Sequence, residues 1–202
     1  MSPRPDVSEA RKNQILDAAA SIFARLGFHE ARMDDIVEAA GLSKGALYWY
    51  FKSKDAIIST LLERVFARSL DDLRGLEAAE GPVSERLLLL TRGVAAELNR
   101  MADLLPVSFE FYAIAGRDAG VQQFLKTYYA NYQAGLAALI RQGIERGEFR
   151  AIDADVAARS ITAVCEGLTL LWILDSQAFD WLAQAEVSIG LLLEGLREKG
   201  GV

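Results

Sequence analysis

Apolar residues recur with the period of an α-helix along nearly all of this 202-residue chain. Near the N-terminus, the apolar residues from Ile15 to Leu26 fall on one face of a helix. Gly27 follows them at a position typical of a helix C-terminus. We find no run of alternating apolar residues bounded by hairpin turns. The sequence therefore predicts an all-α fold.

The same criteria predict about nine helices. Ser43, Ser53 and Asp153 each stand where a helix N-cap is expected. The glycines, glutamates and proline of residues 75–82 predict a loop. The predicted helices cover, in order, residues 15–26, 36–40, 44–51, 54–73, 87–101, 104–115, 119–146, 154–175 and 179–199.

Cysteine content and hydropathy restrict where such a chain works. Cys165 is the only cysteine, so neither an intramolecular disulfide nor a cysteine-based metal site can form. No apolar stretch approaches the ~18 residues of a membrane span. Residues 1–6 lack the apolar segment of a signal peptide. We expect a cytoplasmic protein with no membrane partner and no cofactor.

Residues 36–51 have the pattern of a helix-turn-helix, in which the second helix lies in the major groove of DNA. Gly41 tolerates the left-handed backbone that the turn requires. Ser43 can cap the second helix, and Leu42 and Leu47 occupy the two positions of a hydrophobic staple. The segment therefore has the local features that fix one short helix against another.

The second helix of this motif offers groups for a nucleic acid. Lys44, Gly45 and Ala46 keep its start small enough for the backbone to enter a groove. Three consecutive aromatic residues, 48–50, cannot all be core, and an exposed aromatic cluster indicates a partner. Lys54 lies in the first turn of the next helix, where backbone N–H groups help to bind a phosphate.

The net charge of −6 is unusual for a DNA-binding protein. Residues 1–55 carry eight basic and eight acidic side chains, so the negative excess lies entirely in the remainder. A general basic field is absent. Any contact with DNA must come from a local basic surface and must be strongly sensitive to salt.

The run from Gly41 to Asp55 resembles the DNA-binding signature of the tetracycline-repressor (TetR/AcrR) family of bacterial regulators. The resemblance covers residues 10–62, and the rest of the chain agrees only in the number, length and order of its helices. The chain departs from the family pattern in two places: Ala46 stands where threonine is common, and Ala31 and Arg32 stand near the start of the first helix of the motif, where serine or threonine is common.

The resemblance implies a two-part organisation, with a DNA-binding domain in residues 1–55 and a ligand-binding and dimerisation domain in residues 56–202. It also implies the residues that meet DNA. These predicted DNA-binding residues are Arg32, Met33, Ser43, Lys44, Gly45, Ala46, Tyr48, Trp49, Tyr50 and Lys54. For Tyr48 and Tyr50, ordinary packing against the neighbouring helices is the alternative.

The larger predicted domain is rich in aromatic residues, which either fill a core or line a cavity. Tyrosines clustered on one helix suit a cavity with apolar walls and a few polar groups, and the resemblance favours the cavity. The predicted ligand-binding residues are Leu62, Phe66, Phe109, Tyr112, Tyr128, Tyr132, Cys165 and Trp172. Glu110 and Glu166 either pair with an arginine or select a cationic ligand.

These features predict a DNA-binding regulator, in the form of a repressor that a small apolar or amphipathic effector releases from DNA. The last two predicted helices are apolar over more than one face, which favours a homodimer that packs them as a four-helix bundle. Such a dimer reads a palindromic double-stranded operator with half-sites ~34–36 Å apart.

The alternative function is that of a helical protein-interaction module. Nothing indicates an enzyme, because the chain has no nucleophile elbow, phosphate loop or metal-ligand spacing, and its only histidine, His29, lies outside any such pattern.

Overall fold

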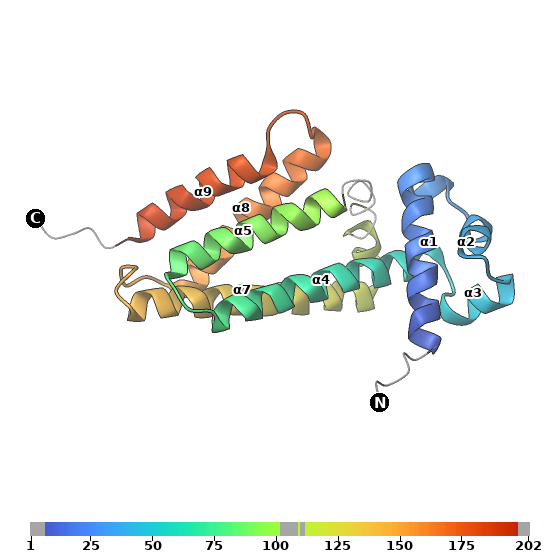
Figure 1. Ribbon diagram of the computed structural model, residues 1–202, viewed down its shortest axis with the longest axis horizontal. Helices are drawn as coiled ribbons and strands as arrows, with labels where there is room; N and C mark the ends of the chain where they lie inside the picture. Colours follow the sequence, from blue (N-terminus) through green and yellow to red (C-terminus); the bar gives the residue numbers. More distant parts are fainter. Residues whose placement is uncertain (1–6, 102–108, 110–111, 198–202) are drawn as a thin grey trace, which may run out of the picture. The chain divides into compact units, whose positions relative to one another are not determined.

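The computed structural model describes residues 7–101, 109 and 112–197. Over these residues the secondary structure is helical, apart from an isolated bridge between Phe149 and Arg197. The all-α prediction is thus confirmed. The helices are α1 (Val7–Glu30), α2 (Met33–Ala40), α3 (Lys44–Tyr50), α4 (Lys54–Ala78), α5 (Val83–Arg100), α7 (Ala119–Glu145), α8 (Ala154–Leu174) and α9 (Trp181–Leu196). Figure 1 labels them along the ribbon.

The chain divides into two compact units. Unit 1 comprises residues 1–66 and 101–123, and unit 2 comprises residues 67–100 and 124–202. Each unit therefore contains part of α4, and the segment before α7 belongs to unit 1. The functional boundary predicted at residue 55 stays a prediction.

Unit 1 forms its core on the apolar stripe that the sequence predicts. Ile15, Ala19 and Phe23 of α1 are almost completely buried, and α2 packs on α1 (Figure 1). The side-chain amide of Gln14 donates a 2.7 Å hydrogen bond to the carbonyl of Ala40 at the end of α2. The C-terminal end of α2 is therefore fixed against α1 before α3 begins.

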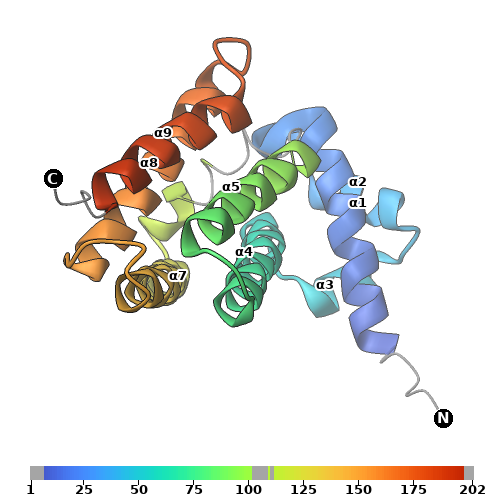
Figure 2. The same cartoon turned by 60° about the vertical axis from the view of Figure 1, so that its left-hand side comes forward.

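Unit 2 is a layered bundle in which α9 runs alongside both α8 and α5, as the two views in Figures 1 and 2 agree. Its main core joins α4 and α5 to α7, α8 and α9, and includes Leu73, Leu87, Leu139 and Ile189. A smaller cluster around Trp181 packs the end of α5 against the start of α9.

The loop predicted for residues 75–82 is wrong in its first half, because α4 continues to Ala78. Arg86 supplies the reason: its guanidinium is buried and donates to the carbonyls of Leu76 and Ala79 at 3.0 and 3.1 Å. A cation on the last carbonyls of a helix satisfies groups that have no partner within the helix and complements its dipole. That partner comes from the following helix, so the local sequence does not reveal it.

Two further expectations concern particular segments. The helix predicted for residues 104–115 lies mostly outside the described residues, and residues 112–115 are helical.

One described helix, α8, is long and apolar enough by length and composition to cross a membrane, with 22% of its apolar window buried. The expectation that no apolar stretch reaches this length is therefore wrong for α8, whose few charges are widely spaced.

Candidate nucleic-acid interface

The turn between α2 and α3 has the geometry that the sequence predicts. Gly41 adopts a left-handed conformation with φ 62° and ψ 34°, a region that costs other residues free energy. The hydroxyl oxygen of Ser43 accepts a 3.2 Å hydrogen bond from the backbone N–H of Ala46. Leu47 and Phe51 are buried. Turn, cap and apolar contacts together fix the orientation of α3, as a helix-turn-helix requires.

The remaining face of α3 is open. Lys44 and Gly45 are exposed, and a Cβ added to Gly45 would meet nothing within 4 Å. Trp49 is 69% exposed, and its ring meets the ring of Tyr50 edge to face at 4.6 Å. Ala46, Tyr48 and Tyr50 are half-buried. Of the three consecutive aromatic residues, Trp49 is thus the one that faces solvent most.

Lys44 is the basic group at the start of this face, and it already has a partner. Its Nζ lies 2.7 Å from a carboxylate oxygen of Asp34 in α2, and both side chains are more than 60% exposed. The hydrogen bond to Asp34, and then its charge, raise the pKa of Lys44. Lys44 therefore stays protonated, and a phosphate oxygen must compete with Asp34 for it.

Arg32 and Met33 stand at the start of α2. Arg32 is exposed, and its backbone N–H donates a 2.7 Å hydrogen bond to the carboxylate of Asp35. This bond is half of a capping box and fixes the first turn of α2. Met33 is half-buried. Both predicted positions thus lie at the N-terminus of α2, and only Arg32 is fully open to solvent.

Lys54 has a different environment from the one predicted. Its Nζ donates to the carbonyls of Phe28, Ala31 and His29 at 2.5, 2.6 and 3.0 Å, and it lies 4.8 Å from the centre of the Phe28 ring. The three N–H donors of an ammonium group are then all used. The geometry does not support a phosphate contact by Lys54 and instead makes it the residue that ties α4 to the end of α1.

The chain is similar to known regulatory proteins. Residues 15–61 match the model of bacterial regulatory proteins of the tetR family, and residues 83–194 match the C-terminal model of BetI-type transcriptional repressors. The HTH-type transcriptional regulator YfiR of Bacillus subtilis is 32% identical over 158 residues, which cover 75% of each chain. This chain belongs to the TetR family. It is thus a member of a family of DNA-binding transcriptional regulators.

Solved structures extend the likeness over nearly the whole chain. The fatty acid degradation regulator FadR from Bacillus halodurans is 26% identical, with a TM-score of 0.76, and the match covers 94% of this chain and 97% of that one. FadR from Bacillus subtilis, solved in complex with stearoyl-CoA, has a TM-score of 0.75 at 23% identity over 92% and 99% of the two chains. The second likeness shows the fold alone.

The effector residues predicted for this TetR protein divide between the two units. Leu62, Phe66, Phe109 and Tyr112 belong to unit 1, in which Leu62 is buried while Phe109 and Tyr112 are exposed. The remaining predicted residues, from Tyr128 onward, belong to unit 2.

In unit 2, Tyr128 and Tyr132 stack with their ring centroids 5.8 Å apart. Burial raises the pKa of Tyr132 above its ordinary value and raises the pKa of the Cys165 thiol to about 11. The charge of Glu166, which is exposed, adds to both shifts. Tyr132 and Cys165 pack against the main core of unit 2. Glu110 lies outside the described residues.

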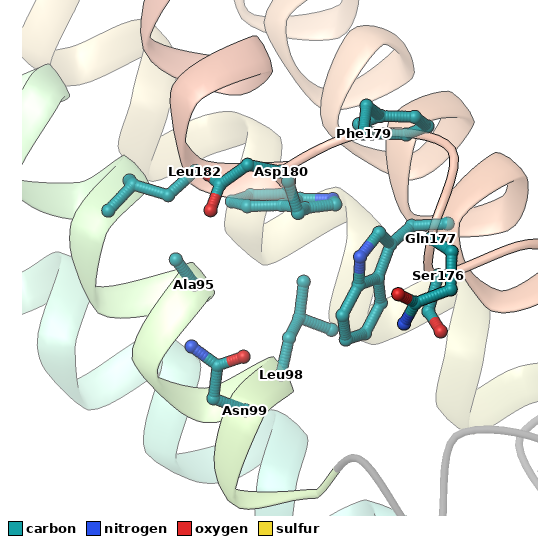
Figure 3. Close-up of a pocket in the computed structure, with 10 residues that line it drawn as sticks. Ala95, Leu98, Asn99, Ser176, Gln177, Phe179, Asp180 and Leu182 are labelled. Atoms are coloured by element: carbon teal, nitrogen blue, oxygen red, sulfur yellow. The ribbon is translucent and has the colours of Figure 1, made fainter.

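Trp172 lines a different place, a pocket of about 320 Å³ at one end of unit 2. Figure 3 shows Leu98 and Asn99 of α5 facing Phe179 and Asp180 across it. Of the residues predicted to bind an effector, only Trp172 is among the described residues that line this pocket. The other lining residues were missed, because two segments far apart in the sequence, residues 95–99 and 172–182, form it. The sequence offered one signal: tryptophan and phenylalanine close to the Asp180 cap of α9.

Proposed function

We propose that this TetR-family regulator is a repressor that binds a palindromic operator as a homodimer and dissociates when a small effector binds. One observation carries the DNA-binding part. The capped helix α3 is fixed through Leu47 and Ser43, and its opposite face offers a lysine, a glycine and the most exposed tryptophan of the chain.

The expected contacts follow from that face. Gly45 and Ala46 let the helix backbone approach base edges, while Lys44 and Trp49 reach the sugar-phosphate backbone or a base. Tyr48 and Tyr50 can donate their hydroxyl protons to phosphate oxygens. Arg32 adds a second cation at the start of α2. Because unit 1 has no general basic field, these few contacts carry the affinity.

The homodimer is supported by an apolar surface on α8 and α9. Six large apolar side chains on these two helices are 47–69% exposed, an arrangement that a four-helix bundle with a second copy would bury. These side chains are Val156, Leu170, Leu171, Leu174, Val187 and Leu191. The same surface explains why α8 is apolar enough to resemble a membrane span.

The dimer is tested by sedimentation velocity. Leu174→Glu should convert the protein to a monomer, because two carboxylates would be buried without partners at a twofold interface. Leu89→Glu is the matched control, since Leu89 is 51% exposed on α5. A wild-type protein that is monomeric, or that pellets with phospholipid vesicles, contradicts the proposed interface.

The effector part is supported by the family and by the pocket. Bacillus subtilis FadR, which has the same fold, was solved with stearoyl-CoA, so this architecture accommodates small molecules in that protein. The pocket in unit 2 is large enough for a small organic ligand.

The decisive experiment is selection of bound sequences from a random pool of duplex DNA. We expect enrichment of a palindrome whose half-sites lie about one helical turn apart. Lys44→Ala should weaken binding to the selected sequence and lower the slope of log affinity against log salt by about 1. Lys126→Ala, an exposed lysine of unit 2, is the matched control. Absence of any enrichment at low ionic strength would refute the DNA-binding function.

A further inference from the structure

Two charged side chains on α8 and α9 form no ion pair with a described residue. One is Arg159, the one cation of these two helices, and the other is Glu194 of α9. Both side chains are exposed, and we call them the unpaired charges. They have opposite signs, and they lie on the two helices whose exposed apolar side chains support a homodimer.

Glu194 lies within the exposed apolar stripe of α9. Val187, Leu191 and Glu194 follow one another at intervals of four and three residues, so they share one face of the helix. Ile189 and Leu193 are buried on the opposite side, in the main core of unit 2. A second protein surface that covers Leu191 must therefore also cover the carboxylate of Glu194.

Arg159 has the corresponding position on α8. It precedes the exposed Leu170 by 11 residues, which is close to three full turns, so the two side chains point in nearly the same direction. The exposed Val156 lies one turn before it, whereas Ala158 and Ile161 are buried in the core. Arg159 thus borders the apolar stripe of α8.

Burial of either unpaired charge alone would oppose dimer formation, because a charge that leaves water without a partner costs several kcal/mol. Other acidic groups of these helices already have a cation within the chain. Asp155 pairs with Arg141 at 2.7 Å, and Glu186 pairs with Arg92 at 2.7 Å. A second copy of the chain offers each unpaired charge an opposite one.

The two unpaired charges lie at the same end of the helix pair. Arg159 is near the start of α8 and Glu194 is near the end of α9, and the two helices lie side by side in opposite directions (Figures 1 and 2). The backbone N–H of Arg150, just before α8, donates a 2.8 Å hydrogen bond to the carbonyl of Leu196 at the end of α9. This bond fixes the two helix ends beside each other.

We propose that Arg159 of each copy pairs with Glu194 of the other copy in the homodimer. The proposal rests on the proposed homodimer and deepens it, because it names the contact that makes a second copy of this chain the matching partner. A twofold axis repeats every contact, so the interface contains two such ion pairs. The two copies then meet with the same ends of their α8–α9 pairs side by side.

Exchanging the charges one at a time tests the pair on the full chain, free of DNA. Arg159→Glu creates two contacts between carboxylates in its own homodimer, and Glu194→Arg creates two contacts between guanidinium groups. Like charges in contact across an interface are strongly unfavourable, so we expect each variant to have a dimer Kd roughly tenfold to a hundredfold above that of the wild type. Sedimentation equilibrium measures this constant.

Mixing the two variants is the decisive measurement. A heterodimer of Arg159→Glu with Glu194→Arg has opposite charges at both contacts, so the mixture should recover nearly the wild-type dimer Kd. Native mass spectrometry identifies the heterodimer, because the two chains differ in mass. A role confined to one chain predicts no recovery, since each chain keeps its own altered charge.

The matched control makes the same exchanges on exposed residues outside α8 and α9. Arg74→Glu in α4 and Glu38→Arg in α2 should each keep the wild-type dimer Kd, and their mixture should show no preference for the heterodimer. Circular dichroism confirms that the variants are folded. If either interface variant is insoluble alone, both chains are expressed together in one cell, where recovery of a soluble heterodimer is the expected result.

Each outcome decides the proposal. A heterodimer preferred over both variant homodimers supports it. It is overturned if both single variants dimerise like the wild type, or if weakened dimers do not recover on mixing or on expression together. A monomeric wild-type protein overturns the homodimer and the ion pair together, whereas a dimeric wild type with unaffected variants overturns the ion pair alone.

Discussion

Replacing Lys54 by methionine tests whether a residue of the DNA-binding signature stabilises the fold or binds phosphate. The structure gives its ammonium group three hydrogen bonds, to the carbonyls of Phe28, His29 and Ala31, and a cation–π contact with Phe28. Methionine keeps the length and apolar stem of the side chain but cannot donate. The three carbonyls at the end of α1 then lose their common partner.

The size of the effect follows from these contacts. Hydrogen bonds to a charged group contribute about 1.5–3 kcal/mol each, but these three come from the same ammonium group and are not additive. We expect Lys54→Met to lower the free energy of unfolding by about 2–4 kcal/mol. For a chain of this length, that corresponds to a fall in Tm of roughly 5–15 °C.

Thermal unfolding followed by far-UV circular dichroism measures the change. Lys52→Met is the matched control, because the Nζ of Lys52 donates one exposed hydrogen bond, to the carbonyl of Tyr48 at 2.6 Å, and surface changes usually stay within about 0.5 kcal/mol. The reasoning is refuted if Lys54→Met keeps the wild-type Tm while its DNA affinity falls and the salt slope drops by about 0.9. That pair of results would make Lys54 a phosphate ligand, as the sequence predicts.

Three other predictions concern the interface and the core. Asp34→Asn releases Lys44 from its ion pair, so DNA affinity in a gel shift should rise severalfold and depend more steeply on salt; an affinity below that of the wild type would contradict this. Gly41→Ala should lower the free energy of unfolding by about 1–2 kcal/mol because of the positive φ, whereas Gly45→Ala should raise it by up to about 1 kcal/mol in a denaturant titration. The Cys165 thiol, whose pKa burial raises to about 11, is protonated at pH 8 and should react with iodoacetamide roughly tenfold to a hundredfold more slowly than the same thiol in urea; equal rates would show that the thiol is not buried.

The parts of the fold that the sequence predicted are those determined by neighbouring residues. A cap such as Ser43 or Asp153 acts within three residues of itself, and both make the predicted hydrogen bonds. Gly41 is recognised in the same way, since the turn demands a conformation that glycine tolerates best. Helical periodicity is equally local, which is why the helix order was predicted correctly.

The parts that were missed depend on residues brought together by the fold. The extension of α4 past Gly75 depends on Arg86, which lies on the next helix and reaches back to the last carbonyls. The pocket depends on Leu98 and Trp181, which are more than 80 positions apart in the sequence. A pattern along the sequence does not indicate which distant residues line the same pocket.

Lys54 is a residue that the sequence singled out correctly but with another partner. The sequence predicts that its ammonium group binds a phosphate, whereas in the structure it donates to backbone carbonyls. A lysine in the first turn of a helix, next to a predicted DNA-binding helix, has the chemistry to bind phosphate. In the structure its partners are carbonyls more than 20 residues away, at the end of α1. These bonds connect α4 to the end of α1 in unit 1, and α1 also holds α2 through Gln14. A charged residue of a signature motif can therefore serve to hold the elements around the DNA-binding helix in place.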